Sequence, residues 1–265
     1  MAEHGKLIWD QTGSRFYETG VSNTALYVKE KQDGGGYAYS AGVAWSGVTG
    51  ITESPSGAES SDLYADNIKY LSLTSAEKYD LTIEAYTYPD AWEKCNGVTE
   101  VAGVKVSQQA RAVFGLAYIT KIGNDEAGDD YGEKIHIVYN CKTAPSEISH
   151  ATINDSPEAG TFSYSVSTTT EVIPDFTIGT GSAAKTVSIK PTSHVEISST
   201  GFTTSTMKYY NQLKDVLFGK DDTSSEVLDG LTPSLPTIAD VIKYCNGDYW
   251  VEPDNGGEDE ENGVG

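Results

Sequence analysis

The stretch from residue 43 to residue 90 constrains the fold most, because β-rich segments in it flank a long run with no strand or helix pattern. Val43–Thr52 mixes Val, Trp, Thr and Ile with two glycines, which predicts a strand that must bend. Tyr79–Tyr88 alternates polar and apolar side chains, as a half-buried strand does. Between them, Glu53–Asp66 reads ESPSGAESSDLYAD and is longer than an ordinary hairpin loop. We therefore expect an antiparallel sheet that carries one long, irregular, protruding loop.

Short alternating segments recur along the first 200 residues, at a spacing that favours an antiparallel β-sandwich or a partly closed barrel. Further strands are expected at Val21–Lys31, Tyr37–Trp45, Arg111–Thr120, Glu133–Cys141, Thr161–Thr168, Lys185–Ile189 and His194–Ser198. Both faces of Arg111–Thr120 are apolar, which predicts a strand covered on both sides. In Glu133–Cys141, the alternation predicts one inward face that runs from Ile135 to Cys141. The predicted fold class is mainly β.

Three helices are expected in addition to the strands. A short one at Asp90–Asn96 has Asp90 available as a cap and ends before Gly97. Apolar residues at helical spacing predict one helix that stops at Gly219 and another that starts after Pro236. We expect the last two helices to cover a face of the sheet.

The charge distribution separates the C-terminal end from the rest of the chain. The net charge is −21, and residues 251–265 contain acids, Gly and Asn with almost nothing to bury, so we expect them to be disordered. The predicted organisation is a β-domain at 1–200, a helical extension at 201–250 and this acidic tail at 251–265. No basic patch is present, which argues against a nucleic-acid-binding protein. The acidity fits simple solubility, or a surface that lies near DNA without binding it.

Cysteine usage and segment hydropathy predict a soluble protein with reduced thiols. Cys95, Cys141 and Cys245 have no metal-ligand spacing, and an odd number suits buried free thiols better than a disulfide framework. The N-terminal residues contain no apolar signal segment, and no stretch is long and apolar enough to span a membrane.

No catalytic constellation emerges from the sequence, so we predict neither an enzyme nor a cofactor. The four histidines are scattered, and each is expected to be a surface or strand histidine rather than a ligand: His4, His136, His150 and His194. The acidic run Gly123–Glu133 is the best candidate for Ca²⁺, but it departs from the EF-hand pattern, and a polar turn between strands is the simpler interpretation. A phosphate-binding loop is not indicated, because no Gly-Lys-Ser/Thr follows the glycines at 34–36.

Four separated motifs occur in a fixed order over roughly residues 14 to 247. They are GVTGITESPSGAESSDLYADNIKYL, LTIEAYTYPDAWEKCNG, FGLAYITKIGNDEAGDDYGEKIHIVYN and ATINDSPEAGTFSYSVSTT. Together they resemble the major tail protein, or tail tube protein, of long-tailed, non-contractile (siphovirus-type) bacteriophages. Members of that family form hexameric rings that stack into the tail tube. The resemblance implies a β-sandwich or barrel of the tail-tube type with a flanking helix, here Asp90–Asn96. Many relatives carry a further C-terminal module, whereas this chain has only two helices and the acidic tail.

The resemblance also implies site residues. A long loop in this family reaches the neighbouring ring, and here it corresponds to Glu53–Asp66. The candidate ring-stacking residues are Glu53, Ser56, Glu59, Asp62 and Asp66. Acids are expected to line the lumen, through which DNA passes without specific binding. Asp80 and Glu84, on the polar face of one strand, are candidates, although that face could equally point to outside solvent.

The implied partners are further copies of the chain, the tape-measure protein, and the tail tip and tail terminator proteins. The implied location is the tail of the virion, after assembly in the bacterial cytoplasm, without a membrane. Two other classes of function stay open. A monomeric surface decoration or adhesin module would explain the Tyr content and the acidity equally well. A glycan-active enzyme would require two carboxylates at a fixed separation across a cleft, and nothing in the sequence selects such a pair.

Overall fold

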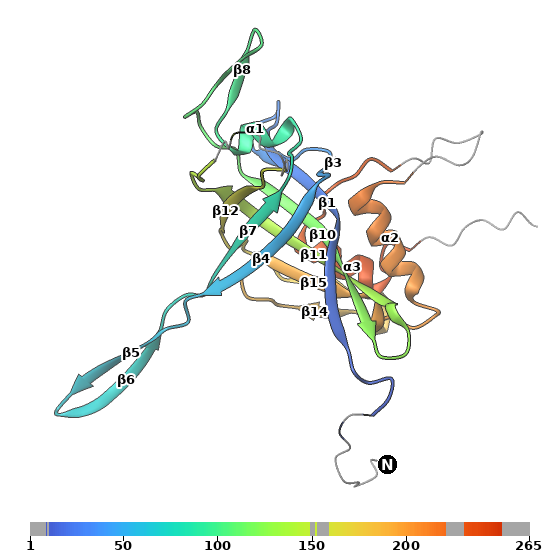
Figure 1. Cartoon of the computed structure of the whole chain (residues 1–265). Coiled ribbons are helices and arrows are strands. Elements are labelled where there is room, and N and C mark those ends of the chain that lie inside the picture. The colour runs from blue at the N-terminus through green and yellow to red at the C-terminus, as the bar shows by residue number, and fades with distance from the viewer. Residues whose placement is uncertain (1–8, 10, 149–151, 153–158, 221–230, 251–265) are drawn as a thin grey trace, which may run out of the picture.

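The computed structural model describes residues 9, 11–148, 152, 159–220 and 231–250 (Figure 1). Strands account for 47% and helices for 14% of the described residues, which confirms the prediction of a mainly β fold. The strands pair antiparallel, but within the described residues the sheet does not close into a barrel. The expected disorder of 251–265 concerns residues outside the described part of the chain.

The main sheet has nine strands in the order β2-β1-β10-β11-β12-β7-β4, with β15 beside β11 and β3 beside β1. Their bounds are β1 Tyr17–Lys31, β2 Tyr37–Tyr39, β3 Val43–Ala44, β4 Val48–Ser56, β7 Lys78–Ala85, β10 Phe114–Asn124, β11 Gly128–Thr143, β12 Phe162–Thr168 and β15 His194–Ser198. Three hairpins are separate from it: β5 Ser60–Ala65 with β6 Ile68–Thr74, β8 Thr99–Val101 with β9 Val104–Val106, and β13 Phe176–Ile178 with β14 Lys185–Val187. The helices are α1 Ala91–Cys95, α2 Met207–Phe218 and α3 Ile238–Asn246.

The first core lies between the two halves of the main sheet, because β4, β7 and β12 pack against β1, β10 and β11. As predicted, Leu81, Ile83 and Ala85 of β7 point inward and are buried. Trp92 of α1 is fully buried in this core, with its ring centroid 4.4 Å from that of Trp45 and 5.0 Å from that of Tyr164. Tilted and edge-on aromatic pairs at these distances stabilise the fold beyond what the burial of their apolar surface contributes. This half of the molecule is therefore a β-sandwich with a short helix at its end.

The second core lies on the opposite face of β1, β10, β11 and β15, where α2 and α3 cover the sheet (Figure 1). Leu213 and Leu217 of α2 and Val241 of α3 are almost fully buried against it. Gly219 and Gly247 follow the two helices with φ of 86° and 84°, backbone angles that residues with a side chain rarely adopt. The prediction of two peripheral helices over a sheet, and of a strand covered on both sides, is confirmed.

Strand β11 changes faces near its end. Ile135, Ile137 and Tyr139 point toward the helices as predicted, but the expectation that Cys141 continues that face was wrong. Asn140 has a φ of 50°, and the pairing of β11 with β10 shifts there, so an extra residue is inserted. Such a bulge reverses the side-chain alternation that follows it, and Cys141 enters the sandwich core.

The structure also corrects two local details. The expected bent strand at Val43–Thr52 is divided between β3 and β4, with Gly47 at a φ of 82° between them. The helix α1 begins after Asp90, but the Asp90 side chain makes no capping hydrogen bond, contrary to expectation. Gly97, with a φ of 73°, does end this helix as predicted.

The largest correction concerns Glu53–Asp66, which is not an irregular loop. β4 continues to Ser56, and β5 then pairs with β6 to form a hairpin that projects far from the sandwich (Figure 1). Asp66 and Asn67 turn the hairpin with φ of 51° and 65°, the left-handed pair that a type I′ turn requires. Ser-rich β5 becomes a strand because β6 supplies an alternating partner of higher β-propensity. We call residues 60–74 the arm.

A short interruption, the joint, separates the arm from the sandwich. β4 and β7 are paired up to Ser56 and Lys78, and the arm ladder resumes at Ser60 and Thr74. Gly57 and Ala58 between them have φ of 91° and 51°. A side chain at Gly57 would collide with the carbonyl oxygen of Ala76, so the joint depends on glycine there.

Candidate functional site

The arm exposes more apolar surface than a two-stranded ribbon can stabilise in water. Large side chains that are exposed along it are Leu63, Tyr64, Ile68, Tyr70, Leu71 and Leu73. Leu63 lies directly opposite Leu71 and shares its face with Leu73, which we call the leucine face. An isolated hairpin is marginally stable, and an exposed apolar patch of this kind marks a binding surface.

The opposite face of the arm carries Tyr64 beside a set of polar side chains that bond to one another. Asp62 accepts a hydrogen bond from the Ser72 hydroxyl at 2.7 Å and pairs with the Lys69 ammonium at 2.7 Å. This contact with Lys69 lowers the pKa of the exposed Asp62 carboxyl. The arm is therefore amphipathic, and the leucine face is the one left for another molecule.

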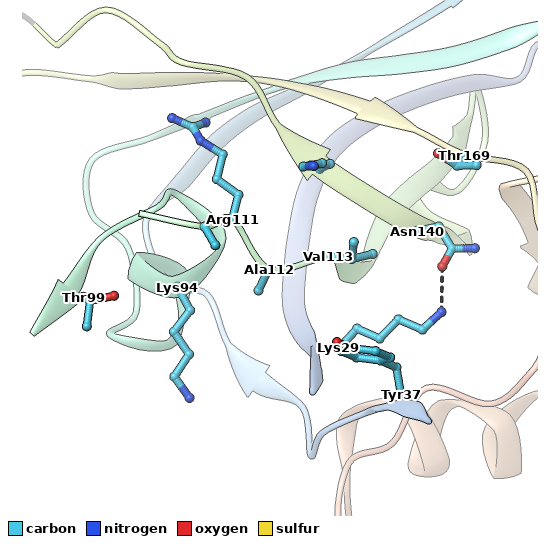
Figure 2. A pocket seen from close by; sticks show the side chains of 11 residues that line it. Lys29, Tyr37, Lys94, Thr99, Arg111, Ala112, Val113, Asn140 and Thr169 are labelled. Atoms are coloured by element: carbon cyan, nitrogen blue, oxygen red, sulfur yellow. Dashed lines mark hydrogen bonds between the residues drawn. The ribbon is translucent and has the colours of Figure 1, made fainter. Parts of the chain in front are cut away.

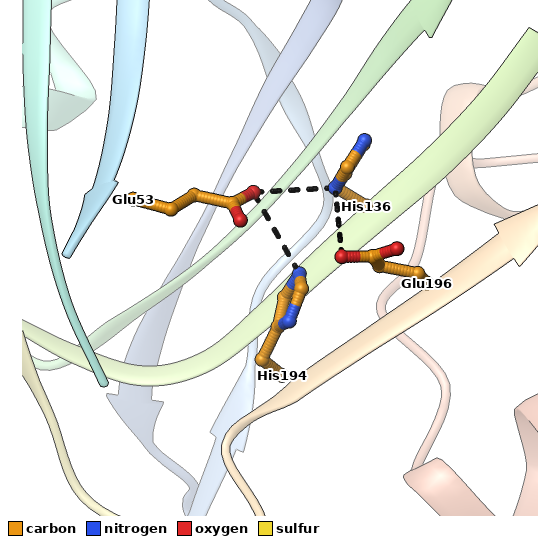
Figure 3. Close-up of side chains that lie close together, drawn as sticks. All are labelled: Glu53, His136, His194 and Glu196. Atoms are coloured by element: carbon orange, nitrogen blue, oxygen red, sulfur yellow. Dashed lines mark ion pairs between the residues drawn. The ribbon is translucent and has the colours of Figure 1, made fainter. Parts of the chain in front are cut away.

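The five candidate stacking residues lie in different places. Asp62 is on the arm and Asp66 is at its tip, while Ser56 and Glu59 flank the joint. Glu53 is in β4, and its carboxylate points back toward the sandwich (Figure 3). The sequence-based list of stacking residues did not include the apolar residues of the arm. The alternation of apolar and polar side chains at the end of Ile68–Thr74 was the available signal for them.

A second exposed hairpin was not predicted. Val101 and Val104 of β8 and β9 face each other across a turn at Ala102 and Gly103, and Val106 follows on the same ribbon. All three valines are exposed. Like the arm, this hairpin projects from the sandwich (Figure 1).

Asp80 and Glu84 lie on a broad polar face formed by β4, β7 and β12. Ser54 and Ser167 flank Asp80, while Gly50 and Ser163 flank Glu84. Thr82 between the two acids is likewise flanked by Thr52 and Ser165, so small polar side chains separate the carboxylates. The predicted alternation of β7 is confirmed, and its polar face presents acids with few cations beside them.

A cleft of about 810 Å³ gathers basic side chains between β1, α1 and β11 (Figure 2). Lys29 donates to Asn140 at 2.9 Å, and Lys94 donates to Glu30 at 2.7 Å. Arg111 donates to the carbonyl oxygen of Thr143 at 3.0 Å. Only Lys94 is paired with a carboxylate, whereas the partners of Lys29 and Arg111 are uncharged oxygen atoms. Lys142 also lines the cleft.

The acidic turn between β10 and β11 is a structural connection. Asn124 accepts hydrogen bonds from the backbone of Glu126 and Ala127, and Asp125 accepts one from the backbone of Gly13 at 3.0 Å. The Tyr17 hydroxyl donates to Asp129 at 2.9 Å. A polar turn between two strands is confirmed, but it is shorter than Gly123–Glu133, because β10 runs to Asn124 and β11 starts at Gly128. Its acids contact the N-terminal segment.

One polar cluster lies inside the sandwich, between β4 on one side and β11 and β15 on the other (Figure 3). Its members come from three strands, and one ligand-type atom of each lies within 4.8 Å of the others: Glu53, His136, His194 and Glu196. This is the only such group of His, Cys, Asp and Glu among the described residues. His136 and His194 are strand histidines, as expected, but their convergence with two carboxylates was not foreseen.

The cluster is formed by strand pairing. His136 of β11 lies directly opposite Glu196 of β15, and His194 is two residues earlier on the same strand. Glu53 reaches them from β4, across the sandwich, where the Tyr118 hydroxyl donates to its carboxylate. The Tyr118 and His136 rings stack at 4.7 Å with an angle of 2°, which fixes the imidazole plane.

Burial and contacts set the charge of the cluster. The His136 imidazole beside the Glu53 carboxylate lowers the pKa of Glu53 to about 2, with further lowering by Tyr118 and opposition from burial. Burial lowers the pKa of His194, although the nearby carboxylates act in the other direction. Glu53 is thus an anion, and His194 is held neutral at physiological pH.

Comparison with models of known protein families gave no match, and comparison with curated protein sequences gave no match either. None of the helices in the described part of the chain is long and apolar enough to cross a membrane.

Proposed function

We propose that this protein is a tail tube subunit of a long-tailed, non-contractile bacteriophage. In this role it polymerises as stacked, hexameric rings, and DNA passes through the acidic lumen during ejection. The proposal combines the sequence resemblance with one structural observation, the amphipathic arm. An arm that projects beyond its own sandwich with an uncovered leucine face is suited to bury that face on another subunit.

Ring formation would also cover the open edges of the sheet. The edge strands β4 and β2 present unpaired backbone groups along part of their length, and such edges favour pairing with another chain. Head-to-tail contacts that close laterally and repeat axially produce a stacked tube. The arm would supply the axial contact, and the sandwich edges would supply the lateral one.

The polar face with Asp80 and Glu84 is our candidate for the lumen wall. The chain carries a net charge of −21, so a surface of this protein repels phosphate unless cations are concentrated on it. On this face, Ser, Thr and Gly surround the two acids. A wall of short polar side chains with spaced carboxylates would let duplex DNA slide without adhesion.

Negative-stain electron microscopy of the purified protein at rising concentration tests the proposal. The expected result is rings or hollow tubes with a bore wide enough for duplex DNA. A triple variant, Leu63→Ser with Leu71→Ser and Leu73→Ser, should fold normally and form no long tubes.

A control variant with Val101→Ser and Val104→Ser removes apolar groups from the other hairpin and should still stack through the arm. Particles that stay monomeric, even after addition of a tail-tip complex as initiator, would overturn the proposal. They would favour a monomeric surface decoration module instead.

A further inference from the structure

We propose that the cluster inside the sandwich is a binding site for one divalent transition-metal ion, with Zn²⁺ as the best match. The ligand atoms are a carboxylate oxygen of Glu53 and of Glu196, Nδ1 of His136 and Nε2 of His194. The inference does not depend on the proposed function, since it rests on the geometry of these four side chains.

The distances in the cluster are close to those of a four-coordinate site. Oε1 of Glu53 lies 3.2 Å from Nδ1 of His136 and 3.9 Å from Nε2 of His194. Nδ1 of His136 lies 4.0 Å from Oε1 of Glu196. In tetrahedral zinc sites with bonds of about 2.0–2.1 Å, neighbouring ligand atoms are ~3.4 Å apart. Small side-chain movements would therefore bring all four atoms to one ion.

Two buried nitrogen atoms in the cluster lack an ordinary partner. Nδ1 of His136 and Nε2 of His194 have no hydrogen-bond partner among the described residues. The His136 side chain is only 5% exposed, and Figure 3 shows Nδ1 directed toward Glu53. Leaving a buried polar atom unpaired costs free energy, so this arrangement calls for an occupant between the side chains.

The surrounding hydrogen bonds determine which nitrogen of His136 carries the proton. Thr120 donates its single hydroxyl hydrogen to Glu18 at 2.6 Å, so its oxygen is an acceptor toward Nε2 of His136 at 3.0 Å. Glu18 also accepts, with its oxygen 3.2 Å from the same nitrogen. Nε2 is therefore a donor toward Glu18, so in the neutral imidazole Nδ1, which lies 3.2 Å from Oε1 of Glu53, is the nitrogen that can offer a lone pair to a metal ion. A carboxylate that orients a histidine through its other nitrogen is the usual outer partner of a metal-binding histidine.

The charges of the cluster match a divalent ion. Three carboxylates meet there, those of Glu53, Glu196 and Glu18. One ammonium offsets them, since Lys134 lies 2.6 Å from Glu18 and 3.3 Å from Glu196. With both imidazoles in the neutral form that metal binding requires, the formal charge is −2, and an ion of charge +2 would neutralise it. Two nitrogen and two oxygen ligands favour Zn²⁺ over Ca²⁺ or Mg²⁺, which prefer six or more oxygens or retained waters.

An ion in this position would join the two layers of the sandwich at the root of the arm. Glu53 lies three residues before the end of β4, whereas the other ligands are on β11 and β15, which the helices back. The bound ion would thus fix the strand from which the arm leaves to the part of the sheet that α2 and α3 cover.

Zinc titration of the full-length protein, after treatment with a chelator and dialysis, tests the site. Competition with a chromogenic chelator should show one equivalent of Zn²⁺ bound per chain, and the thermal midpoint should rise with Zn²⁺. Co²⁺ in place of Zn²⁺ should give the strong visible absorption of a four-coordinate site. His194→Gln and Glu196→Gln, which change partly exposed side chains, should each weaken Zn²⁺ binding at least ~100-fold while the circular dichroism spectrum stays unchanged.

Matched controls make the same chemical changes elsewhere. Glu84→Gln removes an exposed carboxylate from the outer face, and His4→Gln removes a histidine near the N-terminus; both should bind Zn²⁺ as the parent protein does. Equal Zn²⁺ affinity in parent, His194→Gln and Glu196→Gln would show adventitious binding only and overturn the proposal. Absence of binding by the parent protein would also overturn it and would assign the position beside Nδ1 to a proton on His136.

Discussion

The arm and the interior of the sandwich invert the usual distribution of side chains in opposite ways. On the arm, leucine and tyrosine side chains point into water, whereas in the sandwich two histidines and a glutamate are enclosed beside the core. Each arrangement is unfavourable in an isolated chain. The comparison teaches that each region is suited to contact something outside the chain: an apolar surface in the case of the arm and, as proposed above, a cation in the case of the cluster.

The largest difference in the free energy of unfolding is expected between removal of a buried aromatic ring in the sandwich and removal of an exposed one on the arm. Trp92→Ala should lower the free energy of unfolding by about 3–5 kcal/mol, since the ring is fully buried among other aromatic rings. Tyr70→Ala on the arm should change it by less than about 0.5 kcal/mol, since Tyr70 is 70% exposed. Urea unfolding of the monomer measures both. Equal losses would show that the arm is folded against its own sandwich.

A smaller loss of unfolding free energy is expected when a side chain of the cluster is changed. Glu53→Gln removes the charged acceptor of the Tyr118 hydroxyl and should cost about 1.5–3 kcal/mol. The control Glu84→Gln, on the exposed outer face, should be neutral within about 0.5 kcal/mol. Thermal unfolding in chelator-treated buffer checks the pair. An unchanged stability of Glu53→Gln would mean that the contact across the sandwich contributes nothing.

The start of α3 lies outside both regions and provides a reference value for the stability cost of a single substitution. Thr237 accepts a hydrogen bond from the backbone of Asp240 at 3.2 Å, so Thr237→Ala should cost about 1 kcal/mol. Burial acts to raise the pKa of Asp240, but hydrogen bonds from Tyr249 and Thr237 outweigh it, and the pKa is lowered. The stability that this carboxylate contributes is therefore present above its unfolded pKa and is lost as the pH falls through the lowered value. Acid unfolding of Thr237→Ala against the parent should show a smaller loss over that acidic range.

The smallest effect on stability is expected on the polar face of β4, β7 and β12. A change there should instead affect DNA ejection. Asp80→Lys with Glu84→Lys should leave the free energy of unfolding within about 1 kcal/mol, because the two side chains are half-buried or exposed. If they line the bore, DNA ejection from intact tails should slow, because lysines attract phosphate. Unchanged ejection from tails of normal length would place this face outside the lumen.

Local patterns in the sequence predicted most of the elements but not the cluster. The two-sided apolar alternation of Arg111–Thr120 and the stop at Gly219 are set by neighbouring residues, and both are confirmed. The proximity of Glu53 to His136 depends instead on which strands pair and on how the sheet folds over itself. No local spacing encodes it, which is why the histidines looked unrelated.

The arm was misjudged for a different reason. Its Ser-rich first strand has little β-propensity of its own, and Ile68–Thr74 on the far side of the turn makes it a strand. The pair Asp66-Asn67, both of which tolerate a left-handed backbone, was the available signal for a tight hairpin. The face reversal at Asn140 had no comparable signal, because a bulge is fixed by the pairing of two strands.

The joint at Gly57 and Ala58 has a mechanical consequence. Between the two ladders, few backbone hydrogen bonds cross, among them that from Ser75 to Glu59 at 2.9 Å, so this is the most compliant point of the ribbon. In a filament held together by such arms, a bending load would be taken up as small rotations at every joint while the sandwiches kept their shape. The flexural stiffness of the whole filament would then scale with the resistance of two residues to twisting. If the subunit polymerises as proposed, replacing Gly57 would alter how the filament curves before it altered whether the subunit folds.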